Sequence, residues 1–369
     1  MDEVQEYESL KSGAVVVAEI NNLSELPLAL IKARIANGLT QAELAEKVGV
    51  KMQQIQRYEA ERYESASMKT LEKIAGHLNL GINADIRLKS IAAPEELDVK
   101  NYPFRQMFKR NWFGNFSGDF NEAVKDSANL IANFFESAGL PEIKYSFNRK
   151  SVRTGSKVNS FALMAWYAKV VLKSVRQLVK VPFDRQLLTD QWLKDLAQLS
   201  QQEDALLKVT PYLNDVGIRL IIESPLDGTF LDGAALLLSH SGPIIALTLR
   251  HDRLDNFWFV LFHEIAHVKL HLDDERQAIF DDLDLEAQGI EKEADQFALN
   301  ALIPDLVWKK SLVRYSPSSQ TIINQAKELN IGPSLVAGRI RKETGRYHLF
   351  NDLIGIGEVR KCFTQELSM

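Results

Sequence analysis

The sequence predicts a multidomain, mainly α-helical protein with an all-α N-terminal domain, a helical middle region and an α+β domain towards the C-terminus. Three observations support this fold class. Apolar residues recur at helical spacing over about residues 26–80 and again over about 104–200, and short apolar runs bounded by turn residues begin near residue 206. A chain of 369 residues is also long for one hydrophobic core, so two or three domains are expected.

We divide the chain into five segments. An N-terminal arm over residues 1–25 precedes an all-α domain over 26–90 and a helical middle region over 91–205. An α+β domain follows over residues 206–310, and residues 311–369 form a helical C-terminal segment. The boundaries follow changes in apolar spacing and stretches that contain Gly, Pro and Ser. We assign no chemistry to the middle region from its sequence.

Composition excludes several classes of protein. Hydrophobic residues make up 46% and charged residues 25%, which is ordinary for a soluble globular protein. No apolar run approaches the roughly 18 residues of a membrane span, and the acidic start of the chain does not resemble a secretion signal. We therefore expect a cytoplasmic protein without a membrane partner. Cys362 is the only cysteine, so a metal site must be built from His and carboxylates.

Residues 40–55 have the spacing of a helix-turn-helix. Ala45 is small where the second helix passes close, Gly49 permits the tight turn, and Ile55 anchors the next helix. Thr40 and Glu43 form a capping box that fixes the start of the first of these helices. Flanking helices supply the core at helical spacing, through Leu28, Ile31 and Ile35 before the motif and Leu71, Ile74, Ala75 and Leu78 after it.

This region resembles the XRE/Cro-type helix-turn-helix family over about residues 26–80. The resemblance implies a recognition helix from about Met52 to Glu59, lying in the major groove of a double-stranded operator. Gln and Arg suit such a helix, because they form bidentate hydrogen bonds with adenine and guanine. The family's base-reading positions fall on Met52, Gln53 and Arg57, and the position that touches a phosphate falls on Gln41.

The net charge of this segment leaves an alternative open. Lys and Arg barely outnumber Glu between residues 27 and 64, so the same helices would also suit a module for dimerisation or partner docking. Lys51 stands where the family often has a Ser or Thr cap, and it adds a charge that attracts phosphate. If the segment binds DNA, we expect a homodimer on a roughly palindromic site, since one helix in one groove rarely gives enough affinity.

The pentad His263-Glu264-Ile265-Ala266-His267 lies in an apolar run that predicts a buried helix. On a helix, His263 and His267 project from one face and reach one metal ion, while Glu264 stands beside the first of them. This arrangement is typical of zinc hydrolases, although two core histidines beside an unrelated glutamate would give the same pattern. Three preceding apolar runs predict a three-stranded sheet packed on this helix, over Ile218–Ile222, Ala234–Leu238 and Ile244–Leu249.

A zinc site needs a third protein ligand, and a helix over about residues 291–301 offers acidic candidates. At about 100° per residue, Glu291 and Asp295 fall on one border of the apolar stripe of this helix, and Glu293 falls on the other. We therefore predict Glu291 as the ligand, with Glu293 as the alternative. Asp295 is expected to accept a hydrogen bond from the far ring nitrogen of a ligating histidine. His271 continues the face of the two histidines, and either lies near the pocket or is a packing or surface residue.

Residues 206–310 resemble the ImmA/IrrE family of metallopeptidases. The resemblance rests on the strands, the pentad with His271 after it, the segment Glu291–Ala298 and the segment Ala301–Pro304. It implies a gluzincin-type zinc endopeptidase of bacteria or phages, often encoded beside or fused to an XRE-type regulator, with a repressor as the best-known kind of substrate. The order of the two regions in this chain fits such a fusion.

We therefore predict a zinc-dependent endopeptidase fused to a DNA-binding regulator, with Glu264 as the catalytic base that takes a proton from water and returns it to the leaving amine. The substrate is expected to be a repressor or toxin–antitoxin partner, extended along an edge strand such as Ala234–Leu238. The alternative is a DNA-binding repressor or antitoxin in which the peptidase fold is a sensor or scaffold without turnover. A scaffold has no chemical need for Glu264, which favours the enzyme.

Two features downstream of the pentad remain open. An oxyanion needs a second donor, and no spacing selects among the candidates Tyr315, Arg341, Tyr347 and His348. Residues 325–340 predict two helices joined by a tight turn, either a packing hairpin that closes the peptidase domain or a second nucleic-acid element.

Overall fold

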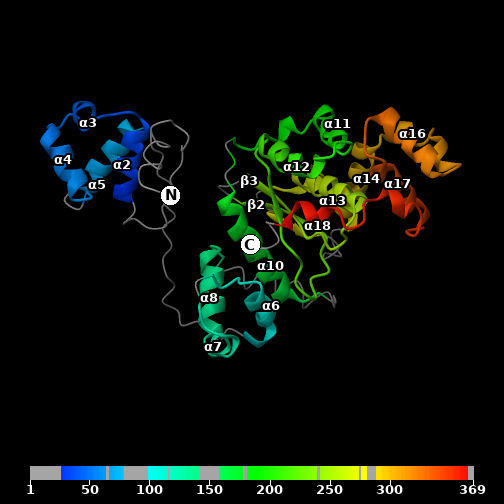
Figure 1. The fold of residues 1–369 in the computed structure, drawn as a ribbon, viewed down its shortest axis with the longest axis horizontal. Helices are drawn as coiled ribbons and strands as arrows, with labels where there is room; N and C mark the ends of the chain where they lie inside the picture. Colours follow the sequence, from blue (N-terminus) through cyan, green and yellow to red (C-terminus); the bar gives the residue numbers. More distant parts are fainter. Residues whose placement is uncertain are drawn as a thin grey trace. The chain divides into compact units, whose positions relative to one another are not determined.

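The computed structural model of the chain describes residues 26–63, 66–78, 99–114, 116–140, 158–177, 179, 181–238, 242–273, 276–280 and 288–364. The N-terminal arm predicted over residues 1–25 lies outside this range. The chain forms two compact units, Met1–Ala93 and Pro94–Met369 (Figure 1). Both are rich in helices and the second contains a small mixed sheet, which confirms the multidomain, mainly α fold class. Among the described residues, no helix has the length and apolarity to cross a membrane.

The first unit is a helical domain with one core. Thr40 caps the second of its helices, because its Oγ1 accepts the Glu43 N–H at 3.2 Å and the Glu43 carboxylate accepts the Thr40 N–H at 2.7 Å. Gly49 ends that helix with φ 74°, a value that side chains rarely tolerate. Ala45 and Ile55 are buried, as the helix-turn-helix spacing predicted. The helices are α2 (Leu26–Ala36), α3 (Gln41–Val48), α4 (Met52–Ala60) and α5 (Met68–His77).

The sheet of the second unit has four strands among the described residues, in the order β1-β3-β2-β4. They are β1 (Arg219–Ile222), β2 (Gly233–Leu238), β3 (Gly242–Leu247) and β4 (Ala278–Phe280). β1 runs parallel to β3, and β2 is antiparallel to both β3 and β4. The sequence predicted three of these strands but not β4, whose three residues are too few to show a period. Since β4 pairs with one side of β2 and β3 with the other, β2 is an interior strand, and its prediction as an edge for substrate is wrong.

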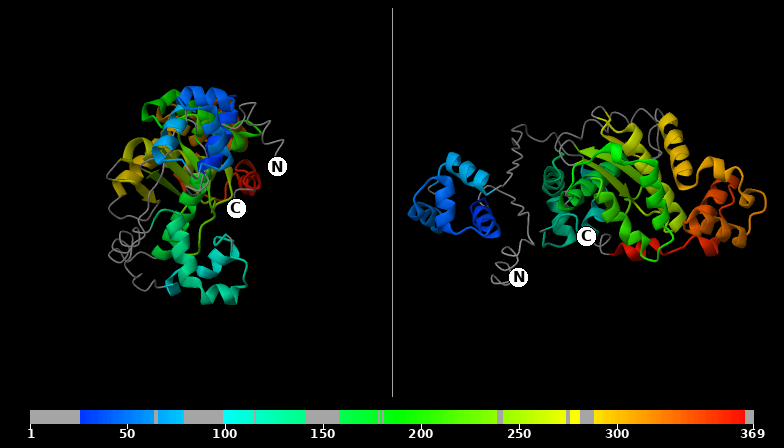
Figure 2. Two further views of the ribbon diagram at one scale, coloured as in Figure 1. Left: turned by 90° about the vertical axis from the view of Figure 1, so that its left-hand side faces the viewer. Right: turned by 90° about the horizontal axis from the view of Figure 1, so that it is seen from above.

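Both faces of the sheet are buried, which explains why its strands appear in the sequence as almost continuous apolar runs. In β3, for example, Ile245 and Leu247 belong to one apolar cluster, and Ile244 and Ala246 belong to the other. The first face is covered by α12 (Ala205–Asn214) and α13 (Leu254–Ala266), with α11 (Asp190–Leu199) in the same cluster. The second is covered by α10 (Ser160–Arg176), with α6 (Phe104–Lys109), α7 (Phe120–Lys125) and α8 (Ser127–Ser137) in the same cluster (Figure 2). The middle region thus shares one compact unit with the sheet, although the sequence-based division separated them at residue 205.

Helix α13 is the central helix of this unit. It continues into η4 (His267–His271), one π-helical turn in which the Leu272 N–H donates to the His267 carbonyl at 2.9 Å. Helix α14 (Gln288–Leu302) packs along α13. Helices α16 (Ser319–Leu329) and α17 (Pro333–Thr344) form the hairpin expected near the C-terminus, and α17 packs on α13 with Leu335 and Ile340 in the core. These contacts favour a packing role for the hairpin.

Candidate metal centre and nucleic-acid interface

Three side chains converge where α13, η4 and α14 meet. Nε2 of His263 lies 2.9 Å from Nε2 of His267 and 3.1 Å from Oε2 of Glu291. Nε2 of His267 lies 3.6 Å from Oε1 of Glu291. A tetrahedral zinc ion with bonds of about 2.0–2.1 Å separates its ligand atoms by about 3.3 Å. The triangle therefore has the size that such an ion requires.

The surroundings of this cluster suit a cation. Oε1 of Glu291 is buried and has no hydrogen-bond partner among the described residues, since His267 is too distant at 3.6 Å. Burial acts to raise the pKa of Glu291, but its interactions with His263 and His267 outweigh this effect and hold the pKa at about 2. An ionised carboxylate with two imidazole nitrogens is a donor set found in catalytic zinc sites. Within the described part of the chain, these three residues are the ones grouped closely enough to hold an ion.

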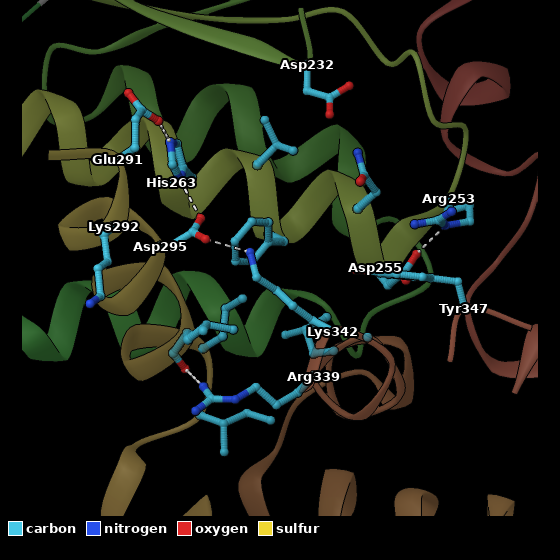
Figure 3. Close-up of a pocket in the computed structure, with 18 residues that line it drawn as sticks. Asp232, Arg253, Asp255, His263, Glu291, Lys292, Asp295, Arg339, Lys342 and Tyr347 are labelled. Carbon is cyan, nitrogen blue, oxygen red and sulfur yellow. Dashed lines mark hydrogen bonds and ion pairs between the residues drawn. The ribbon is translucent and has the colours of Figure 1, made fainter. Parts of the chain in front are cut away.

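The far ring nitrogen of His263 contacts a carboxylate. Nδ1 of His263 lies 3.1 Å from Oδ1 of Asp295, and Oδ2 of Asp295 accepts from Nζ of Lys342 at 2.9 Å (Figure 3). Burial acts to raise the pKa of Asp295, but the hydrogen bonds from His263 and Lys342 lower it overall. The structure thus places Asp295 where the sequence placed it, one helical turn after Glu291. It adds Lys342 of α17, which the sequence did not indicate.

Glu264 is completely buried and lies against the start of β2. A Cβ added to Gly233 would lie 2.2 Å from Oε1 of Glu264 and 2.9 Å from Cγ1 of Val260, so a side chain at this position requires these groups to shift. The sequence analysis assigned no role to Gly233, although a glycine inside a strand often marks a close approach of another group.

The structure also shows where Glu293 and His271 lie, two residues whose roles the sequence left open. The side chain of Glu293, the alternative ligand, is 62% exposed and lies outside the cluster, 3.4 Å from Nε2 of His271. His271 is only 8% exposed, and its Nδ1 lies 3.0 Å from Nδ1 of His267. Burial and the neighbouring His267 lower the pKa of His271. His271 therefore lies in the interior beside His267 and not at the surface.

In the first unit, the residues expected to read DNA lie on the exposed face of α4. Met52, Gln53 and Arg57 are all exposed, and Lys51 precedes the helix without forming a side-chain cap. Gln41 donates from Nε2 to Oε2 of Glu59 at 2.7 Å, and Glu59 also pairs with Arg34 of α2 at 2.6 Å. The Glu59 carboxylate therefore holds α4 against α2 and α3, while Met52, Gln53 and Arg57 meet solvent.

Comparison with protein families finds a match in each of the two units. A family model for the helix-turn-helix matches residues 30–83, and that of a peptidase family, described as the IrrE N-terminal-like domain, matches residues 214–341. The chain is a fusion of an XRE-type helix-turn-helix domain and an IrrE/ImmA-like domain. The predicted resemblances to both families are confirmed. Comparison with curated proteins and with solved structures gave no significant match.

A cleft of about 690 Å³ opens beside the histidine cluster of the IrrE-like domain. His263, Glu291 and Asp295 line one end of it (Figure 3). Its walls come from α13, α14 and α17, and its apolar lining consists of Phe259, Val260, Leu299, Leu302, Ile303 and Leu335. Lys342 also lines the cleft, with Nζ 3.7 Å from the centre of the Phe259 ring. It lies just after residues 214–341, the range that the peptidase family model matches. The C-terminal hairpin therefore contributes directly to the cleft.

The four candidates for an oxyanion donor differ in their position relative to the cleft. Of these, Tyr347 alone lines it, and Figure 3 places Tyr347 near Arg253 and Asp255, at the end away from His263. Arg341 is buried and hydrogen-bonds Asn351 at 3.3 Å, while Tyr315 and His348 are exposed.

Proposed function

We propose that the IrrE-like domain is a gluzincin-type, zinc-dependent endopeptidase, with His263, His267 and Glu291 as the metal ligands. The observation that carries this proposal is the triangle of ligand atoms, 2.9 to 3.6 Å apart, in a buried His and carboxylate donor set. When bound, zinc supplies a Lewis acid that polarises a carbonyl and lowers the pKa of water.

Glu264 acts as the general base in this proposal. It accepts the proton of the attacking water and transfers it to the leaving amine, which ordinarily contributes about 10²- to 10⁴-fold to the rate. Its carboxyl is held between α13 and Gly233 at the start of β2. Asp295 orients His263 through Nδ1, so that Nε2 faces the other two ligand atoms.

The substrate in this proposal is an extended segment of a repressor or of a toxin–antitoxin partner. The edge strand of the described sheet on this side is β4, not β2. Phe280 of β4 pairs with Ala234, the residue after Gly233, so β4 runs close to Glu264. A peptide that pairs with β4 would lie near the base and reach the neighbouring cleft.

We propose further that the helix-turn-helix domain binds a roughly palindromic operator as a homodimer, with Met52, Gln53 and Arg57 at the bases and Gln41 at a phosphate. Tethering a peptidase to DNA raises its effective concentration around proteins bound at the same site. An enzyme that cleaves a DNA-bound regulator must be in the same compartment as that regulator, so we infer that this protein is cytoplasmic.

One observation favours a second candidate function. Glu264 is fully buried and does not line the cleft, as expected of a scaffold without turnover. In that case the chain is a DNA-binding repressor or antitoxin, and its IrrE-like domain senses or docks a partner.

The experiment that separates the two functions compares zinc-loaded wild type with E264Q. Each is co-expressed with every protein encoded nearby, and fragments are identified by mass spectrometry. The peptidase predicts cleavage of one neighbour by wild type and by the control E328Q, an exposed glutamate on α16, but not by E264Q. If no neighbour is cut, and wild type and E264Q bind the same partner and operator equally, the scaffold is correct.

A further inference from the structure

The far ring nitrogen of His267 points at another histidine. Nδ1 of His267 lies 3.0 Å from Nδ1 of His271, and both side chains are buried. The other ring nitrogen of His271, Nε2, lies 3.4 Å from Oε2 of Glu293. The three side chains form a row that leads from the cluster to the exposed carboxylate of Glu293.

Hydrogen-bond chemistry permits one arrangement of protons in this row when Nε2 of His267 faces a cation. A neutral imidazole has one N–H and one lone pair, so a lone pair at Nε2 leaves the proton of His267 on Nδ1. Nδ1 of His271 then has to accept, which leaves the N–H of His271 on Nε2. That N–H faces the Glu293 carboxylate, which accepts hydrogen bonds when ionised. Every contact in the row then has one donor and one acceptor.

The backbone keeps the three histidines in line. In a regular α-helix, each step of four residues turns the side chain by about 40° around the axis, so His271 would drift from the face of His263. Residues His267–His271 instead form a π-helical turn. This wider turn keeps His271 against His267. Such turns are frequent at functional sites.

We propose that His271, supported by Glu293, is a positioning residue of the metal centre that accepts the Nδ1–H of His267. It thereby fixes the tautomer and the ring orientation that present Nε2 of His267 to zinc. This role rests on the proposed zinc site, and it gives the second histidine ligand an orienting partner as Asp295 gives one to the first.

The test compares two substitutions of His271 in the full chain. Leucine fills much of the space but accepts no hydrogen bond, whereas asparagine offers an amide oxygen near the position of Nδ1. Zinc affinity is measured by competition with a chromophoric chelator. We expect H271L to bind zinc about 10- to 100-fold more weakly, and H271N to recover most of that loss. H251L, at an exposed histidine outside the row, is the matched control and should bind zinc like wild type.

A second measurement reports on the hydrogen bond itself. In zinc-loaded protein labelled with 15N-histidine, the Nδ1–H proton of His267 should exchange slowly with water in wild type and H271N, because it is buried and bonded. It should exchange faster in H271L. Circular dichroism and melting of the metal-free variants show whether each is folded.

Equal zinc affinity of wild type and H271L overturns the proposal. So does a folded H271N that binds as weakly as H271L, because packing then explains the effect. Should H271L fail to fold, the wild-type protein decides, since a freely exchanging His267 Nδ1–H contradicts the role of His271. E293A is expected to weaken zinc binding only a few-fold, because the contact between Glu293 and His271 is long and exposed. A loss of zinc affinity larger than that of H271L is evidence against the row. Wild type that binds no zinc refutes the metal centre itself, so the two failures are distinguishable.

Discussion

Gly233 leaves the space in which the carboxyl group of Glu264 lies. An added Cβ would stand 2.2 Å from Oε1 and 2.9 Å from Cδ of Glu264, well inside van der Waals contact. The start of β2 and the pentad of α13 are thus fitted to each other, although 30 residues of chain separate them. The position of the proposed base depends on a residue that carries no chemistry of its own.

G233A is therefore expected to displace Glu264 while leaving the zinc ligands in place. Peptidase activity should fall by about 100-fold or more, since a general base contributes about 10²- to 10⁴-fold. Overpacking should also lower stability by about 1–3 kcal/mol. Zinc content, activity and melting temperature are the measurements. G289A on α14, where an added Cβ meets nothing within 4 Å, is the control and should keep activity. Full activity of G233A would show that Glu264 has room to move.

Much of the fold follows from local patterns in the sequence. The capping box at Thr40, the turn at Gly49 and the apolar spacing of α13 depend on residues close together in the chain. β4 was not predicted, because it forms through pairing with β2, more than 40 residues earlier in the chain. The packing of α10 on the sheet was also not predicted, since no local pattern indicates which face a buried helix covers.

In the candidate site, too, the sequence predicted the residues that share a helix but not those brought in from elsewhere in the chain. Helical geometry alone set His263 and His267 together and separated Glu291 from Glu293, and the structure has these side chains in those positions. Lys342 lies 47 residues after Asp295 in the chain, and the packing of α17 on α13 brings the two side chains together. Such tertiary contacts leave no periodicity in the sequence.

The metal ligands give the next prediction. H263A and H267A should abolish stoichiometric zinc binding, whereas E264Q should retain zinc and lose hydrolysis, because it removes the base and not a ligand. E291A should lose zinc and E293A should largely keep it. Zinc content is measured on purified protein after dialysis. Loss of zinc from E264Q, or loss from E293A with retention by E291A, would reverse these assignments.

Acid stability of the metal-free protein tests the state of Glu291. Its pKa in the folded protein is about 2, below the ordinary value of 4.5, so the ionised carboxylate stabilises the folded state. This contribution is complete above about pH 4.5 and is lost as the pH falls towards 2. With a chelator present, the urea midpoint of wild type should therefore fall more steeply between about pH 5 and pH 3 than that of E291Q. Parallel curves would show that Glu291 does not have a depressed pKa.

Lys342 offers a test of the contact between α17 and the metal centre. Its ammonium group donates to Asp295 at 2.9 Å, and Asp295 in turn contacts His263 at 3.1 Å. K342M should raise the pKa of Asp295 and weaken zinc binding, by less than the roughly 10- to 100-fold expected for loss of a direct orienting partner. K292M changes an exposed lysine that also lines the cleft, so it is the control. If both variants bind zinc equally, Lys342 does not act through Asp295.

The helix-turn-helix domain gives the last prediction. Arg57 is exposed on α4, so R57A should lose discrimination at one base pair in each half-site, at a cost of about 1–3 kcal/mol. Q41A should weaken binding to all sequences alike, as loss of a phosphate contact does. Because Gln41 also donates to Glu59, the melting temperature of Q41A must be compared with wild type before its affinity is interpreted. Binding is measured on a panel of single-base operator variants at fixed salt. A uniform loss from R57A would make Arg57 a phosphate contact, and the absence of binding in a genomic selection would leave α4 as a docking surface for protein.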